Sequence, residues 1–113
     1  DLVAGARAAL VPSVWYENCP LSILEAHALG TPVITMDRGG MSELVEDGVT
    51  GVMFHELSGR ALADAVERLL SDRQALARMR ENCLRRRQEL PTLERYCARV
   101  EEIYREEIRR KER

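Results

Sequence analysis

Two carboxylates, Glu17 and Glu25, stand on either side of a proline, and the residues around them suggest how they could bind a ligand. The apolar run Ala8–Val11 predicts a short buried strand, which a proline ends. After a polar loop, Pro20 suits the entrance of a helix, and Ser22 is expected to cap that helix with its hydroxyl. The sequence therefore predicts a strand, a loop that carries Glu17 and a helix that carries Glu25.

This predicted arrangement favours a ligand with an anionic centre and hydroxyl groups at both ends. In a parallel α/β sheet, ligands bind beyond the carboxyl ends of the strands. The free N–H groups and the positive dipole end of a helix favour a phosphate there. A carboxylate accepts hydrogen bonds from both hydroxyls of a vicinal diol. A nucleotide sugar combines a ribose diol, a diphosphate and sugar hydroxyls in this order.

Two segments carry a resemblance to a known family. Residues 12–34 read P-S-x-W-Y-E-N-C-P-L-S-I-L-E-A-H-A-L-G-T-P-V-I, and residues 39–51 read G-G-x-x-E-L-V-E-D-G-x-T-G. Together they resemble the donor-binding half of the C-terminal domain of retaining GT-B glycosyltransferases, in particular glycosyltransferase family 4 (group 1). The motif-rich part is 1–56, and 58–113 fit as the helical part. The resemblance implies an α/β fold, the later half of a Rossmann-like parallel-sheet domain followed by long C-terminal helices.

The resemblance also implies an activity and a set of site residues. Similar enzymes transfer a sugar from a UDP-, GDP- or ADP-sugar to an acceptor with retention of configuration, without a metal or another cofactor. By this resemblance, Glu17 is the catalytic group that contacts the transferred sugar, and Glu25 accepts hydrogen bonds from the ribose. The substrate-binding set is Glu17, Asn18, Cys19, Leu21, Ser22 and Glu25, with backbone amides of this segment on the distal phosphate. Pro20 stands where many relatives have glycine and lacks an N–H, so the side chain of Asn18 is expected to compensate.

Two other classes of function remain open at this point. A hydrolase could use Glu17 and Glu25 as an acid and base pair, which requires carboxyl groups about 5 Å or about 6.5–9.5 Å apart across one bond. Alternatively, the chain is a non-catalytic nucleotide-binding or helical interaction module, which its length and its charged helices favour.

Length and the first residues indicate a part of a larger enzyme. The 113 residues suffice for one core but are few for an enzyme that holds two substrates. Residues 1–7 look like the end of a helix that leads directly into a strand. We therefore expect a partial C-terminal domain that lacks its N-terminal GT-B partner domain, is inactive alone, and self-associates through strand edges and an apolar stripe on its last helix.

Charge is unevenly distributed along the chain. Residues 1–59 carry two basic and eight acidic side chains, whereas residues 60–113 carry fifteen basic and eleven acidic ones. Solvated helix faces are the simpler interpretation of the basic half, and a peripheral contact with the inner face of a membrane is the other. Three widely spaced cysteines without a C-x-x-C pair indicate free thiols, a cytoplasmic location and no zinc site. Nothing indicates a nucleic-acid partner.

Several further residues lie in or near the predicted site. Trp15 and Tyr16 could stack on a base, but packing of their loop onto the sheet edge is preferred. His27 is expected to be a hydrogen-bonded or surface histidine without a role. Gly39–Gly40 permits either a tight turn or a close backbone approach, and Glu43 is expected to support the site from behind the residues that touch the ligand.

The spacing of apolar residues in the second half of the chain predicts three helices. Ser58, Asp72 and Thr92 are expected to cap them, and the three arginines at 85–87 are expected to be exposed. Cys83 and Cys97 fall on the apolar stripes, so both are expected to be small core residues. Val33–Met36 and Thr50–Phe54 are the two further strands.

Overall fold

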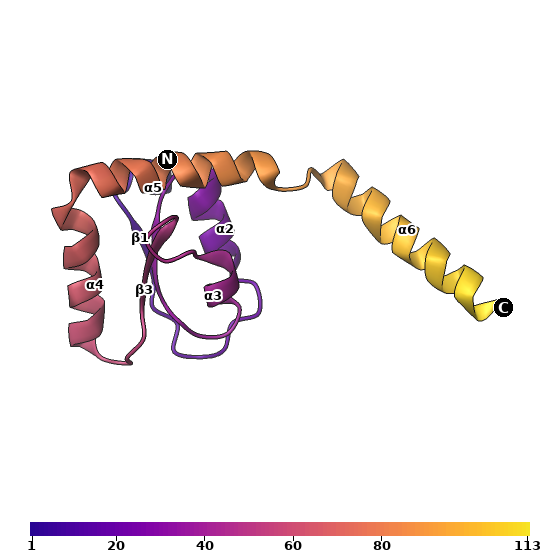
Figure 1. The fold of residues 1–113 in the computed structure, drawn as a ribbon, viewed down its shortest axis with the longest axis horizontal. Coiled ribbons are helices and arrows are strands. Elements are labelled where there is room, and N and C mark those ends of the chain that lie inside the picture. Colours follow the sequence, from indigo (N-terminus) through magenta and orange to yellow (C-terminus); the bar gives the residue numbers. More distant parts are fainter.

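The computed structural model describes all residues from Asp1 to Arg113 as a three-layered α/β unit with one helix standing away from it (Figure 1). In chain order the elements are α1 (Leu2–Gly5), β1 (Ala9–Val11), α2 (Leu21–Ala28), β2 (Val33–Met36), α3 (Met41–Leu44), β3 (Gly51–Phe54), α4 (Gly59–Ser71), α5 (Arg73–Glu89) and α6 (Leu93–Lys111). The three strands are parallel in the order β1-β2-β3. The predicted α/β fold with a parallel sheet followed by helices is therefore confirmed.

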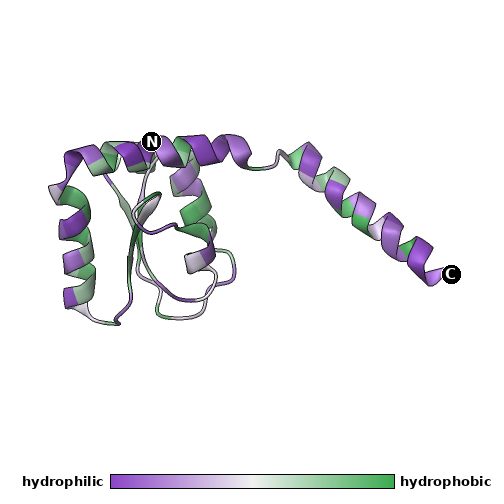
Figure 2. Cartoon of the chain, in the orientation of Figure 1, coloured by the Kyte–Doolittle hydropathy of each residue, from purple (hydrophilic) through white to green (hydrophobic).

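The central strand β2 is buried on both faces, because helices cover the sheet from both sides. Val33 points to a cluster with Ile23 and Met41, from α2 and α3, whereas Ile34 points to a cluster with residues of α4 and α5 such as Leu69. Figure 2 shows the apolar residues gathered on the strands and on the inner faces of these helices. This continuous apolar run is the pattern of a buried parallel strand.

Helix α5 lies across the amino ends of the strands. Arg80 donates to the carbonyl oxygens of Ala4 and Ala6 before β1, at 3.2 and 2.8 Å, and Asn82 donates to the oxygen of Val49 before β3, at 3.0 Å. The opposite, carboxyl edge is formed by the loops that follow β1, β2 and β3 (Figure 1). The carboxyl edge is thus left free of a covering helix.

The predicted helix caps agree with the structure in three of four cases. Ser58, Asp72 and Thr92 each accept a backbone N–H three residues on, at 3.1, 2.9 and 3.3 Å. The helix after Pro20 begins at Leu21, as expected, but the cap expected from Ser22 is wrong, because no side chain caps α2. Gly30 follows α2 with a φ of 76°, a conformation that glycine adopts without strain.

Two expectations for buried and exposed residues are wrong. Cys83 is buried, and burial raises the pKa of its thiol to about 11, but Cys97 lies on α6 and is exposed. Arg86 is half-buried rather than exposed, because its guanidinium donates to the oxygen of Leu44 at 3.2 Å and to Glu46 at 2.8 Å. The spacing of apolar residues along a helix shows which face is apolar, but it does not show whether another element covers that face.

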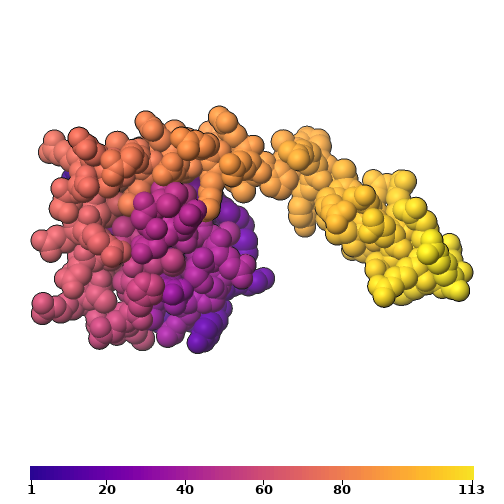
Figure 3. Space-filling model, viewed as in Figure 1, coloured from indigo at the N-terminus to yellow at the C-terminus, as the bar shows by residue number.

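Helix α6 contributes nothing to this core. None of its residues is buried, and its apolar side chains stay exposed, including Leu93 at 72% and Tyr104 at 67%. In the space-filling view the helix projects from the body of the molecule (Figure 3). Self-association through this stripe remains a prediction. No helix of the structure is long and apolar enough to span a bilayer.

The buried His27 predicts a pH dependence of stability. Burial lowers the pKa of His27 below its usual value near 6.5, Arg86 adds to this effect, and the 3.2 Å hydrogen bond to the Thr50 oxygen opposes it. Below about pH 6.5 the unfolded state therefore binds the proton more readily than the folded state, so the free energy of unfolding falls with falling pH. Comparison of urea denaturation at pH 7.5 and pH 5.5 measures this slope.

His27→Gln is expected to flatten that slope. Gln74→Ala serves as the control and is expected to keep the slope of the wild type, because Gln74 is exposed on α5 and does not titrate. A His27→Gln protein with an unchanged slope would contradict the assignment.

Candidate functional site

The predicted site residues lie on the loop between β1 and α2, which carries Glu17, Asn18 and Cys19, and on the first residues of α2, which carry Leu21, Ser22 and Glu25. Glu17 is half-buried within this loop, and Glu25 is exposed on α2. The other predicted residues are also exposed and stand between them: Asn18, Cys19, Leu21 and Ser22. The structure thus brings the predicted residues to the edge where parallel sheets bind ligands.

The carboxylate of Glu17 is held by its own loop. Its Oε1 accepts a hydrogen bond from the indole Nε1 of Trp15 at 2.6 Å and another from the hydroxyl of Ser13 at 3.4 Å. Both hydrogen bonds go to the same oxygen, so Oε2 has no protein partner. One oxygen of Glu17 is therefore available to accept a hydroxyl of a ligand.

Glu25 has no side-chain hydrogen bond within the protein. It lies on α2, whose first N–H groups have no side-chain acceptor. Free N–H groups at a helix start attract an anion. The edge thus offers acceptors at two places and backbone donors between them.

The loop after β2 packs directly against the loop of Glu17. The N–H of Gly40 donates to the backbone oxygen of Glu17 at 2.6 Å. A Cβ on Gly40 would lie 1.7 Å from the backbone oxygen of Asn18, and a Cβ on Gly39, whose φ is 56°, would lie 2.7 Å from the oxygen of Glu17. Both expectations for this glycine pair are met, because the pair forms a turn into α3, closed by the N–H of Met41 to the oxygen of Arg38 at 3.3 Å, and also approaches the neighbouring backbone closely.

Arg38 is a contact that the sequence did not reveal. Its guanidinium donates to the backbone oxygen of Val14 and lies 5.2 Å from the centre of the Tyr16 ring. The order β1-β2 in the sheet could have indicated this neighbourhood, because adjacent parallel strands bring their following loops together. The residue types alone gave no signal for Arg38.

The expectation for the aromatic pair is wrong. Trp15 is 62% exposed and Tyr16 is 79% exposed, so they do not pack the loop onto the sheet. The loop is instead fixed from the other side by the residues after β2. Both rings consequently stand at the surface beside Glu17.

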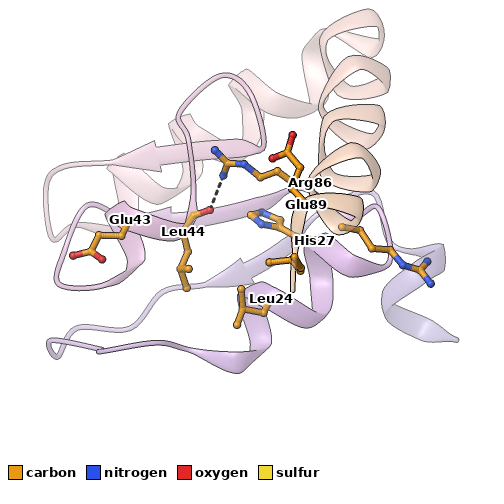
Figure 4. Close-up of a pocket in the computed structure, with 8 residues that line it drawn as sticks. Leu24, His27, Glu43, Leu44, Arg86 and Glu89 are labelled. Atoms are coloured by element: carbon orange, nitrogen blue, oxygen red, sulfur yellow. Dashed lines mark hydrogen bonds between the residues drawn. The ribbon is translucent and has the colours of Figure 1, made fainter. Parts of the chain in front are cut away.

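A separate pocket of about 270 Å³ lies between α2, α3 and α5 (Figure 4). Its lining residues are Leu24, His27, Glu43, Leu44, Arg86, Arg87, Glu89 and Leu90. Neither Glu17 nor Glu25 borders this pocket. Glu43, expected to support the site, lines it instead. No group of three or more His, Cys, Asp or Glu side chains is arranged to hold a metal ion.

Comparison with known proteins gives one consistent family. Residues 1–86 match the sequence profile described as "Glycosyl transferases group 1". The chain is 48% identical over 69 residues to a glycogen synthase of Thermodesulfovibrio yellowstonii, covering 61% of this chain and 14% of the relative. It is 44% identical over 79 residues to a D-inositol 3-phosphate glycosyltransferase of Nocardia farcinica, covering 70% and 16%. The chain thus spans about a sixth of the length of these relatives.

Solved structures agree with the sequence comparison. Sucrose-phosphate synthase from Thermosynechococcus elongatus superposes with a TM-score of 0.84 and 32% identity, over 95% of this chain and 27% of the other. Anabaena HepE in complex with UDP gives a TM-score of 0.73 and 28% identity, over 78% and 24%. A further structure of HepE contains UDP-glucose.

The close approach of the two loops predicts that position 40 tolerates only glycine. Gly40→Ala places a methyl group on the Asn18 backbone and is expected to lower the free energy of unfolding by about 1 to 3 kcal/mol. Gly59→Ala is the matched control, because a Cβ there meets nothing within 4 Å at the first residue of α4. That control is expected to be neutral or stabilising by up to about 1 kcal/mol. Equal stability of the two variants in urea denaturation would contradict the packing described here.

Proposed function

The chain belongs to the group 1 glycosyl transferases, and we propose that it is the donor-binding part of a family 4 enzyme that transfers a sugar with retention of configuration. The single observation that carries the proposal is the pairing of the loop after β1, which presents a free oxygen of Glu17, with the uncapped start of α2, which is followed by the exposed carboxylate of Glu25. In this proposal residues 1–113 are one partial C-terminal GT-B domain, and a second domain binds the acceptor.

Each part of the site has a role in binding a nucleotide-diphosphate sugar. Glu25 accepts hydrogen bonds from the ribose hydroxyls, because it is anchored in a helix at one end of the site. Backbone N–H groups of Cys19, Leu21 and Ser22 hold the distal phosphate, aided by the side chain of Asn18, since Pro20 has no N–H. Glu17 accepts from a hydroxyl of the transferred sugar through Oε2. The two acids thereby lie at the ends of the diphosphate rather than against it.

The mechanism places the chemistry of this chain at Glu17. A hydrogen bond to the sugar that strengthens as charge develops on the ring lowers the barrier, whereas equal binding of substrate and transition state does not. The leaving diphosphate needs cationic groups, and residues 1–59 contain only Arg7 and Arg38, of which Arg38 contacts its own protein. The proposal therefore assigns that stabilisation to residues outside this chain, without a metal, and expects the chain alone to be inactive.

The nature of the base and of the sugar is open within this proposal. Because HepE structures contain UDP and UDP-glucose, UDP-sugars are the first donors to test, followed by GDP- and ADP-sugars. A thermal-shift panel on the complete protein is sufficient, since a ligand that binds only the folded state raises the apparent stability. The enzyme is proposed to work in the cytoplasm, with the basic helices as solvated faces and a peripheral contact at the inner membrane face as the alternative.

A non-catalytic helical interaction module is the second candidate, favoured by the exposed apolar stripe of α6. A stable monomer of 12.9 kDa in light scattering would support a self-contained module, whereas self-association is expected if α6 normally packs against a further part of the enzyme.

The role of Glu25 predicts a loss of nucleotide affinity. Glu25→Gln in the complete protein removes a charged acceptor from the ribose hydroxyls, which corresponds to about 1.5 to 3 kcal/mol, or roughly 10- to 150-fold in Kd. Calorimetry with the bare nucleoside diphosphate measures this effect, because the ribose is present without the sugar. Glu67→Gln, on the exposed side of α4, is the control and should bind normally. Unchanged affinity of Glu25→Gln would refute the role.

The role of Glu17 predicts a loss of turnover with normal nucleotide affinity, the reverse of the effect expected for Glu25. Glu17→Gln is expected to leave the Kd of the bare nucleoside diphosphate within about twofold and to lower donor turnover about 10-fold or more, the behaviour of an interaction used in the transition state. Release of nucleoside diphosphate from the sugar nucleotide measures turnover. A variant with normal kcat and weak nucleotide binding would mean that the two glutamates have each other's roles.

A further inference from the structure

Arg38 contacts Val14 and Tyr16, the residues on either side of Trp15. This short segment directly precedes Glu17. Its guanidinium donates to the backbone oxygen of Val14, and its central carbon lies 5.2 Å from the centre of the Tyr16 ring. A planar guanidinium can donate to a carbonyl and face an aromatic ring at the same time. One side chain from the loop after β2 thus holds two points of the loop after β1.

The backbone that carries Arg38 is itself fixed on both sides. Before it, the N–H of Asp37 donates to the oxygen of Phe54 at 2.9 Å, and the Asp37 carboxylate lies 3.1 Å from Nδ1 of His55. After it, the N–H of Gly40 donates to the oxygen of Glu17 at 2.6 Å. Arg38 therefore extends from a segment anchored to β3 and to the Glu17 loop.

The loop of Glu17 needs such support from outside. No helix or strand forms between Val11 and Leu21, and both Trp15 and Tyr16 are largely exposed, so the core does not fix them. Trp15 in turn donates its indole N–H to Glu17, so the position of the carboxylate depends on the position of Trp15. A group that acts on a substrate must be held within about 0.5 Å of its productive place.

We propose that Arg38 is a positioning residue, which fixes the Val14–Tyr16 segment and through it orients the Glu17 carboxylate toward the transferred sugar. The inference rests on the proposed function for the sugar-binding role of Glu17. It adds a residue that acts through the Glu17 loop, and it locates the control of sugar turnover in the loop of a neighbouring strand.

A double-mutant cycle in the complete protein tests this path of action. Arg38→Ala is expected to lower kcat for release of nucleoside diphosphate about 10-fold while the Kd of the bare nucleoside diphosphate stays within about twofold. In a Glu17→Gln background the same substitution is expected to change kcat less than twofold, because the group through which it acts is already lost. Arg38→Lys keeps a cation near the ring and one donor, so it should recover part of kcat.

The controls separate positioning from general damage. Arg78→Ala removes an exposed arginine of α5, the helix at the opposite, amino ends of the strands, and should keep wild-type kcat. If Arg38→Ala does not fold, Arg38→Met, which keeps the aliphatic stem, takes its place. If Arg38→Ala lowers kcat by the same factor in the wild type and in the Glu17→Gln background, the role of Arg38 is merely structural and the inference is overturned.

A second measurement does not depend on sugar transfer. Trp15 is the single tryptophan of these 113 residues, so in a complete protein whose other tryptophans are replaced by phenylalanine its time-resolved fluorescence anisotropy reports this loop. Arg38→Ala is expected to raise the amplitude of fast depolarisation at least twofold over Arg78→Ala, and an amplitude equal to that control would overturn the inference. Normal turnover of Glu17→Gln would instead sink the proposed function of Glu17, whereas normal turnover of Arg38→Ala beside an impaired Glu17→Gln would sink this inference alone.

Discussion

The burial of β2 on both faces is the constraint on which the rest of the structure depends. All four residues of this strand, Val33–Met36, are buried: Val33 packs in the cluster with α2 and α3, and Ile34 and Met36 pack in the cluster with α4 and α5. The hydroxyl of Thr35 is satisfied there by the backbone oxygen of Val11 at 2.8 Å, which ties β1 to the same strand. With α2 and α3 on one face and α4 on the other, the loops after β1 and β2 emerge side by side.

The site depends on contacts between backbones more than on charge. The loop of Glu17 meets the loop of Gly39–Gly40 without side chains between them, and the N–H of Gly40 replaces the hydrogen bond that a strand would provide. Arg38 then adds a cation that contacts the loop at Val14 and Tyr16. The loop is thereby fixed at several points, while one oxygen of Glu17 and the carboxylate of Glu25 on α2 have no protein partner.

The local features of the chain could be predicted from the sequence because local rules govern them. The caps at Ser58, Asp72 and Thr92 depend on a single side chain and the following turn, and β2 was recognisable from four consecutive apolar or β-branched residues. The strand–loop–helix order around Glu17 and Glu25 followed from the same kind of signal. These predictions required no knowledge of distant contacts.

The features that depend on distant contacts could not be predicted. The exposure of Cys97 and of the aromatic residues at 15 and 16 depends on which element covers them, and the partial burial of Arg86 depends on Leu44 and Glu46, some forty residues away. The roles of Arg38 and Gly40 likewise require the register of two strands. Periodicity reports what a face is made of, but tertiary packing decides whether it is buried.

Gly39 and Gly40 restrict how loops can be exchanged between this chain and a relative. Because the backbone at Gly40 leaves no space for a side chain beneath Asn18, the loop after β1 and the loop after β2 have one shared shape. A donor loop taken from a relative would fit this scaffold only together with the four residues from Asp37 to Gly40 that belong to it. The natural unit for exchange is therefore a pair of loops, and a chimera that moves residues 12–20 alone would disturb the contact that holds Glu17.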